Sequence, residues 1–266
     1  MIMNKRILSI LSAISLFSFV ACTNEDEPIT STQKGEVRFS VIDTTQVEVE
    51  TKAITGLDVN DFNVALSRND QWIFSSRKYK DIAGTSISCE TGTGYIATAE
   101  SCTEGEAERA NNNWGQVRVA GKKEFEVKPI EPANVQIQCA LANTSVSVVF
   151  SDYVKKYFSD YSITLHAADA TGRSFTFDKN NYSYKTAYFN VGTEKRALQY
   201  TASLTLPGAK EPYTSTGSQT MDPASSYKFT VKLEDESKSK LSIQITTIDG
   251  TLVKEETFNE TVNPYK

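Results

Sequence analysis

Apolar and polar residues alternate with a period of two along most of the chain, and helical periodicity is almost absent. Alternation of this kind places every second side chain on one face of a strand, as in an antiparallel sheet with one buried face. The clearest runs are 37–41, 62–66, 72–74, 87–89, 95–99, 123–128, 135–141, 145–150, 162–166, 175–177, 187–189, 200–206, 227–233 and 241–246. The pattern therefore predicts an all-β protein.

Turn-forming residues separate these runs. The Gly92-Thr-Gly94 turn predicts a hairpin that sets Cys89 opposite about Tyr95. The polar segment 100–113 is predicted as a loop, and the short segment 154–158 as a helical turn.

The number and spacing of the predicted strands favour two packed-sheet units in succession. Pro129 and Pro132 bracket a turn near the middle of the chain, and Asp249-Gly250 predicts a further hairpin close to the end. We therefore predict two tandem antiparallel β-sandwich domains, the N-terminal one at residues 36–133 and the C-terminal one at residues 134–266.

The N-terminus has the organisation of a bacterial secretory signal. Lys5 and Arg6 form a positive region, and residues 7–21 are apolar apart from four serines. This stretch is shorter than the roughly 20 apolar residues that a membrane-spanning helix needs. We therefore predict that residues 1–21 are a cleaved signal peptide.

The signal peptide ends in Phe19-Val20-Ala21-Cys22, which resembles the lipobox of bacterial lipoproteins, although Phe19 stands where leucine is usual. This resemblance implies that Cys22 carries a lipid and holds the protein on the outer membrane. Residues 22–35 are then a lipidated cysteine and a flexible linker. An ordinary signal peptide followed by a chance cysteine is the alternative.

An acidic run, Glu25-Asp26-Glu27, follows the cysteine. It resembles the export signal that sends lipoproteins of Bacteroides-type bacteria to the outer face of the outer membrane. We therefore expect a lipid-anchored protein at the cell surface. A solvated tether on a periplasm-facing lipoprotein is the alternative.

Charge and composition argue against nucleic acid as a partner. The formal net charge is -5, and the 28 Lys and Arg residues are scattered among 33 Asp and Glu residues. No basic patch is visible that would follow a phosphate backbone.

Four cysteines are present, and with Cys22 acylated at most one disulfide can form. Cys139 shares its strand positions with apolar residues, which predicts a buried thiol. Cys89 and Cys102 can pair, but the expected hairpin register does not favour this bridge.

No catalytic or metal-binding constellation is visible in the sequence. His166 is the only histidine. The residues around it in the sequence supply neither a nucleophile with an orienting group nor further zinc ligands. The acidic runs at 104–108 and 234–236 lack the pattern of a calcium loop and are predicted as solvated loops. We therefore predict a protein that is not an enzyme and holds no metal or cofactor.

Aromatic residues in polar, turn-rich segments give the clearest hint of binding. Trp72, Trp114, Tyr182, Tyr184 and Tyr188 are of this kind. Exposed rings beside amide side chains bind sugars through their apolar faces. The alternative is that these rings belong to the core, as most of the 12 Tyr and 13 Phe must.

Several packing motifs together resemble one family. These motifs are Asp61-Phe62-Asn63-Val64, Gly94-Tyr95-Ile96-Ala97, the run 139–148 and the run 158–163. They resemble the DUF4493 lipoproteins of Bacteroides-type bacteria, which have no assigned activity. Their layout is similar to that of the fimbrillin-like and Mfa-type adhesins, with a lipobox and two β-sandwich domains, the first of them transthyretin-like.

The resemblance to fimbrillins implies one processing step. In those proteins a trypsin-like protease removes the first strand, and the next subunit donates a strand to the vacated groove. The first strand here is 37–41, and Lys52 follows it where arginine is usual.

The function we expect is therefore a non-catalytic surface lipoprotein that acts in adhesion or as a fimbria-like subunit or anchor. Its partners would be the outer-membrane lipid through Cys22 and other fimbrial subunits. A surface glycan-binding lipoprotein for polysaccharide uptake is the alternative function.

Overall fold

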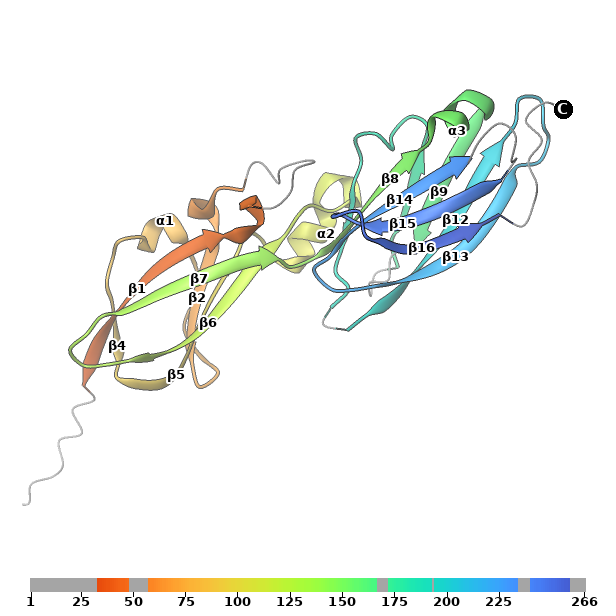
Figure 1. Cartoon of the computed structure of the whole chain (residues 1–266). Coiled ribbons are helices and arrows are strands. Elements are labelled where there is room, and N and C mark those ends of the chain that lie inside the picture. The colour runs from red at the N-terminus through yellow and green to blue at the C-terminus, as the bar shows by residue number, and fades with distance from the viewer. Residues whose placement is uncertain (1–32, 48–56, 167–171, 193, 234–239, 259–266) are drawn as a thin grey trace, which may run out of the picture. The chain divides into compact units, whose positions relative to one another are not determined.

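The structure, a computed structural model, describes residues 33–47, 57–166, 172–192, 194–233 and 240–258 (Figure 1). This part of the chain forms sixteen strands in three sheets, with three short α-helices and two 3-10 helices. The prediction of an all-β protein is therefore confirmed. Within the same ranges, no helix has the length and apolar character needed to cross a membrane.

The first sheet has seven strands in the order β3-β2-β5-β6-β7-β1-β4. They are β1 (Lys34–Asp43), β2 (Asn63–Arg68), β3 (Gln71–Lys78), β4 (Ile87–Glu90), β5 (Gly92–Glu100), β6 (Val119–Val127) and β7 (Ala133–Leu141). Only two register pairs join β6 to β7, Val119↔Leu141 and Ala120↔Ala140. This short contact divides the sheet into a β3-β2-β5-β6 part and a β7-β1-β4 part, and side chains from both parts pack into one buried cluster.

The predicted hairpin around Gly92-Thr-Gly94 is wrong. β4 pairs with β1, so Cys89 lies opposite Gly35, and β5 pairs with β2 and β6 instead. Gly92 and Gly94 have φ angles of 128° and 83°, a region that glycine enters readily, so the chain can pass from one part of the sheet to the other. Alternation is the same whichever strand is the neighbour, which is why the pattern did not identify the partner.

The remaining strands form two sheets, in the orders β10-β9-β12-β13 and β11-β8-β14-β15-β16. They are β8 (Thr144–Phe150), β9 (Asp160–His166), β10 (Ser174–Asp178), β11 (Ala187–Phe189), β12 (Arg196–Thr205), β13 (Tyr213–Met221), β14 (Ser226–Leu233), β15 (Leu241–Thr247) and β16 (Leu252–Thr257). β15 and β16 pair across Asp249-Gly250, so this predicted hairpin is confirmed.

The short helical elements are η1 (Thr44–Val47), η2 (Val59–Asp61), α1 (Tyr79–Ile82), α2 (Glu104–Asn113) and α3 (Asp152–Tyr157). The helical turn expected near 154–158 corresponds to α3. The loop predicted at 100–113 is wrong, because α2 lies there. Thr103 and Glu106 form a capping box at its first turn, in which each side chain binds the other residue's backbone N–H.

The capping box gives a simple test of how α2 is held. Replacing Thr103 with alanine removes the hydroxyl that accepts from the Glu106 N–H at 3.3 Å. We expect Thr103→Ala to lower the free energy of unfolding by about 1 kcal/mol, measured by urea denaturation. Thr103→Ser, which keeps the hydroxyl, is the control and is expected to unfold at nearly the wild-type urea concentration.

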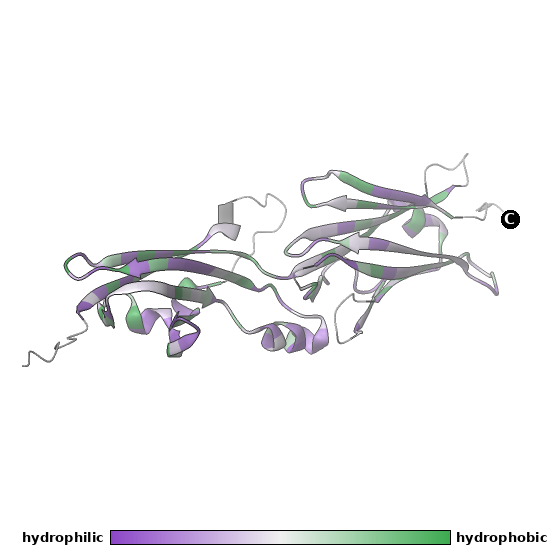
Figure 2. Cartoon of the chain, turned by 90° about the horizontal axis from the view of Figure 1, so that it is seen from below, coloured by the Kyte–Doolittle hydropathy of each residue, from purple (hydrophilic) through white to green (hydrophobic). Residues whose placement is uncertain are grey.

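Two separate buried clusters run through the described residues, one built from strands up to Cys139 and the other from residues between Val146 and Phe258. Figure 2 shows hydrophobic and hydrophilic residues alternating along the strands that enclose them. The boundary predicted at 133/134 falls at the start of β7, yet β7 pairs with β1 and β6 of the first sheet. Strands up to Leu141 belong to the first sheet, and the strands after it belong to the other two. The division into two sandwich domains stays a prediction.

Candidate interaction site at strand β1

β1 is the first strand along the described chain, but it lies inside the first sheet. It pairs in parallel with β7 from Val37↔Ala133 to Asp43↔Cys139, and antiparallel with β4 from Lys34↔Glu90 to Val37↔Ile87. Figure 1 shows β1 and β7 side by side. The strand is therefore held along its length by elements that come much later in the sequence.

The inward side chains of β1 form part of the core. Val37, Phe39 and Val41 are 0%, 5% and 7% exposed. The Phe39 ring meets the ring of Phe74 on β3 edge to face, with 6.4 Å between centroids. Alternation of these residues with the exposed Glu36 and Arg38 is what places the strand in this position.

Gly35, near the start of β1, lies against the backbone that follows β6. A Cβ atom at this position would lie 2.2 Å from the carbonyl oxygen of Lys128 and 2.7 Å from Cγ1 of Val127. Both distances are shorter than a Cβ atom adopts to any non-bonded atom, so only glycine fits here without movement of the backbone.

Asp43, at the other end of β1, is a buried carboxylate. Its Oδ1 accepts from the Thr45 N–H at 2.9 Å and from the Thr45 hydroxyl at 2.6 Å. Its Oδ2 has no hydrogen-bond partner among the described residues, although Asp43 is only 8% exposed. Most buried polar atoms in proteins are paired, so Asp43 Oδ2 is an exception among the described residues.

Cys139 is the register partner of Asp43 on β7 and is fully buried. Burial, together with the negative charge of Asp43, raises the pKa of the Cys139 thiol to about 11. Desolvation likewise raises the pKa of the Cys89 thiol. The thiolate is the reactive form of cysteine, so these are inert structural thiols.

The three described cysteines are all free, so the Cys89–Cys102 bridge considered above is not formed. Cys89 lies on β4 opposite Gly35. Cys102 lies before α2, where its sulfur accepts from the Gln116 side chain at 3.4 Å. The two cysteines belong to separate elements with separate partners.

We expect that no cysteine of the native Cys22→Ala variant reacts rapidly with a thiol reagent at pH 8. All three of Cys89, Cys102 and Cys139 are buried, and reaction requires an accessible thiolate. In denaturant without reductant, three thiols per chain should react. A count of one would instead show that a disulfide forms. The measurement is the absorbance released by a chromogenic disulfide reagent.

The aromatic residues predicted to bind a ligand do not form one surface. Trp72 is 62% exposed on β3, at an edge of the first sheet. Trp114 packs against the second cluster, with its ring centroid 5.6 Å from that of Phe175 and 4.9 Å from that of Phe177. Trp114 is therefore a packing residue, and Trp72 remains available to solvent.

The tyrosines divide in the same way. Tyr182 packs against the second cluster, and burial raises the pKa of the partly buried Tyr188. Tyr184 is 66% exposed.

His166 lies exposed on β9, with its Nδ1 2.9 Å from the hydroxyl of Ser174 on β10. This contact joins two register partners whose side chains are both exposed. The described residues contain no group of three or more His, Cys, Asp or Glu residues that could hold a metal ion.

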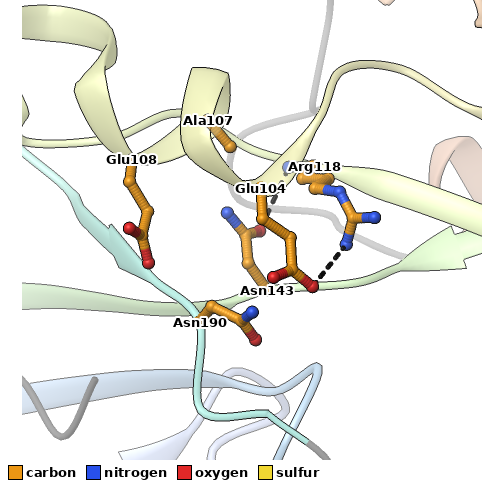
Figure 3. A pocket seen from close by; sticks show the side chains of 6 residues that line it. All are labelled: Glu104, Ala107, Glu108, Arg118, Asn143 and Asn190. Atoms are coloured by element: carbon orange, nitrogen blue, oxygen red, sulfur yellow. Dashed lines mark hydrogen bonds and ion pairs between the residues drawn. The ribbon is translucent and has the colours of Figure 1, made fainter. Parts of the chain in front are cut away.

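Figure 3 shows a crevice lined by Glu104, Ala107 and Glu108 of α2 together with Arg118, Asn143 and Asn190. It has no room for a water molecule. Its polar side chains are used internally, because Arg118 forms ion pairs with Glu100 at 2.7 Å and with Glu104 at 3.7 Å. Asn143 accepts from the Arg118 N–H and donates to the Gln116 carbonyl. The crevice is therefore a packed contact between side chains and not a ligand-binding pocket.

The remaining predicted site residues, Cys22, Glu25, Asp26, Glu27 and Lys52, lie outside the described residues. Lipidation, the export signal and processing at Lys52 therefore stay predictions.

Solved structures with a similar fold include a fimbrial assembly protein from Parabacteroides distasonis and the fimbrial anchor protein Mfa2 from Porphyromonas gingivalis. The first is 11% identical, with a TM-score of 0.44, over 84% of this chain and 98% of that one. The second is 11% identical, with a TM-score of 0.39, over 84% of this chain and all of that one. Likenesses at this level assign no activity to this chain.

No curated protein matches the chain. A family model does match, and it spans residues 33–264, which is most of the 266 residues. The chain therefore belongs to the DUF4493 family, whose description is a domain of unknown function.

Proposed function

We propose that the protein is a lipid-anchored surface subunit that binds a partner protein at the position of β1, by accepting a strand from that partner. This is an adhesive or fimbria-like role without catalysis. The observation that supports it is the placement of β1, whose core side chains are buried while its neighbours β4 and β7 both come from later in the chain.

A vacated β1 position would be a strong strand-binding site. Departure of β1 would uncover the apolar side chains that contact Val37, Phe39 and Val41. It would also leave unpaired backbone groups along β7 and β4, and such an edge is a template for another strand. An incoming strand would restore both the hydrogen bonds and the buried surface.

The order of residues along the chain supplies a route to release. Cys22 and β1 both precede Lys52, while every other described strand follows it. A single cut after Lys52 would therefore leave the lipid and β1 joined to the rest of the protein only by non-covalent contacts, and departure of β1 would release the rest from the membrane. The uncut form would serve as a membrane anchor, and the cut form as a subunit able to leave the membrane.

We expect the protein sheared from the surface of native-host cells to begin at Ala53, and the membrane-bound protein to retain Cys22. Intact mass measurement of both fractions tests this. Lys52→Ala should abolish the sheared form, whereas Lys34→Ala, which removes another exposed lysine, should not. A sheared form that still carries residues before 52 would contradict the proposal.

Glycan binding is the second candidate, and the exposure of Trp72 favours it. Trp72 and the next residue, Ile73, which is 44% exposed, both lie on the edge strand β3, where successive side chains point to opposite faces. An exposed indole can stack on a sugar ring.

The chain has two tryptophans, so a Trp114→Phe variant reports on Trp72 alone. Saccharide-dependent quenching of its fluorescence would support this second function. An equal saccharide response in Trp72→Phe, where only Trp114 emits, would exclude Trp72 as the binding residue.

A further inference from the structure

Resting on the proposed function, we propose that the β1 position selects its partner strand by sequence. The partner would be an extended segment of another protein with glycine at the place of Gly35 and apolar residues at the places of Val37, Phe39 and Val41. It would carry a further apolar residue at the place of Asp43. In such a segment, glycine is followed by four apolar residues. One residue of any kind lies between the glycine and the first apolar residue, and between each apolar residue and the next.

The glycine requirement follows from the backbone beside Gly35. The atom that a Cβ would meet at 2.2 Å is the carbonyl oxygen of Lys128, and backbone cannot rotate away as a side chain can. Any strand that enters in the register of β1 meets the same carbonyl. A residue larger than glycine would therefore have to displace the chain after β6 or shift its own register.

The apolar requirement at three alternate positions follows from burial. Val37, Phe39 and Val41 are each less than a tenth exposed. Phe39 and Val41 lie in register with Val135 and Ile137 of β7, which are also buried. A strand with a charged residue at one of these places would bring that charge into the core without a partner.

The last position explains why a partner strand would displace β1. Asp43 is more than nine-tenths buried and leaves Oδ2 without a hydrogen-bond partner among the described residues. Its register partner is the buried Cys139, not a cation. Valine or isoleucine here would lose the two hydrogen bonds from Thr45, which is partly exposed and can bond to water instead. It would also no longer bury a carboxylate oxygen without a partner, and this larger gain would make the strand bind more tightly than β1 itself.

The test uses the full chain with a site-specific protease sequence in place of residues 48–56, cut once so that β1 stays bound only by its contacts. A fluorescent segment with the sequence of residues 33–47 is exchanged into the cut protein in mild denaturant. Unlabelled segments of the same length then compete with it. They carry the native sequence, Gly35→Val, Asp43→Val or, as a control for added valine, Glu36→Val at an exposed position.

We expect Gly35→Val to compete roughly tenfold or more weakly than the native segment and Asp43→Val roughly tenfold more strongly. Glu36→Val should match the native segment. Equal competition by Gly35→Val, or no gain from Asp43→Val, would overturn the inference while leaving strand acceptance intact. Failure of the cut protein to take up any labelled segment would instead overturn the proposed function.

Discussion

Replacing Phe39 with alanine is expected to lower the free energy of unfolding by about 4 kcal/mol. Phe39 is 5% exposed, and its ring packs edge to face on Phe74 in the opposite part of the same sheet. Alanine would leave a cavity between the two parts, and the cost of such a cavity adds to the lost burial of the ring. Urea denaturation followed by circular dichroism measures the change.

Arg38→Ala is the matched control, because Arg38 directly precedes Phe39 on β1 and its side chain is exposed. Its ion pair with Glu36 joins side chains that are each 52% exposed, and exposed pairs contribute less than about 1 kcal/mol. A Phe39→Ala loss no larger than that of Arg38→Ala would show that β1 is not a core strand, and the strand-acceptance proposal would fail with it.

Trp114→Ala is expected to lower the free energy of unfolding by about 3 kcal/mol. The Trp114 ring packs on Phe175 and Phe177 of β10, and the Lys185 ammonium lies 5.1 Å from its centroid. The variant loses these contacts together. Chemical denaturation followed by far-ultraviolet circular dichroism avoids dependence on tryptophan fluorescence.

Trp72→Ala is the control for Trp114→Ala. Trp72 is 62% exposed, and its removal should change the free energy of unfolding by no more than about 0.5 kcal/mol. Equal losses in the two variants would contradict the division of the two tryptophans into a packing residue and a surface residue.

The alternation of apolar residues predicted the strands because it reports burial directly. At Val37, Phe39 and Val41 the same three residues that alternate in the sequence are the buried ones in the structure. Alternation contains no information about neighbours, however. Nothing local indicates that β1 pairs with β4 and, in parallel, with β7, about a hundred residues away.

α2 shows a signal that was present in the sequence and was missed. The pattern from Thr103 to Glu106 is that of a capping box, but the polar composition of 100–113 favoured a loop. The run Asn111-Asn112-Asn113, with φ angles of 52°, 57° and 66°, also fits a helix end, because asparagine tolerates the left-handed region.

The candidate site itself depends on tertiary contacts that the sequence does not contain. The close approach of Gly35 to Lys128 arises only once β1 lies between its neighbours. The same holds for the burial of Asp43 Oδ2 without a hydrogen-bond partner among the residues that the structure describes. The residues that were predicted as sites from the sequence were instead those with local signals, such as Cys22 and Lys52.

A reversible tether across β1 and β7 tests whether a partner strand binds at the β1 position. Ser40 and Gln136 are register partners on adjacent strands and point away from the core. Neighbouring strands lie about 4.8 Å apart, within the range that a disulfide spans. The pair Ser40→Cys and Gln136→Cys would therefore fix β1 in place in the protein cut within 48–56, and a reductant would release it.

The measurement is uptake of the fluorescent 33–47 segment by this tethered protein before and after reduction. We predict no uptake while the disulfide is closed and uptake equal to that of the untethered protein once it is reduced. Equal uptake in the oxidised and reduced forms would place strand binding somewhere other than the β1 position, and strand acceptance at β1 would be wrong.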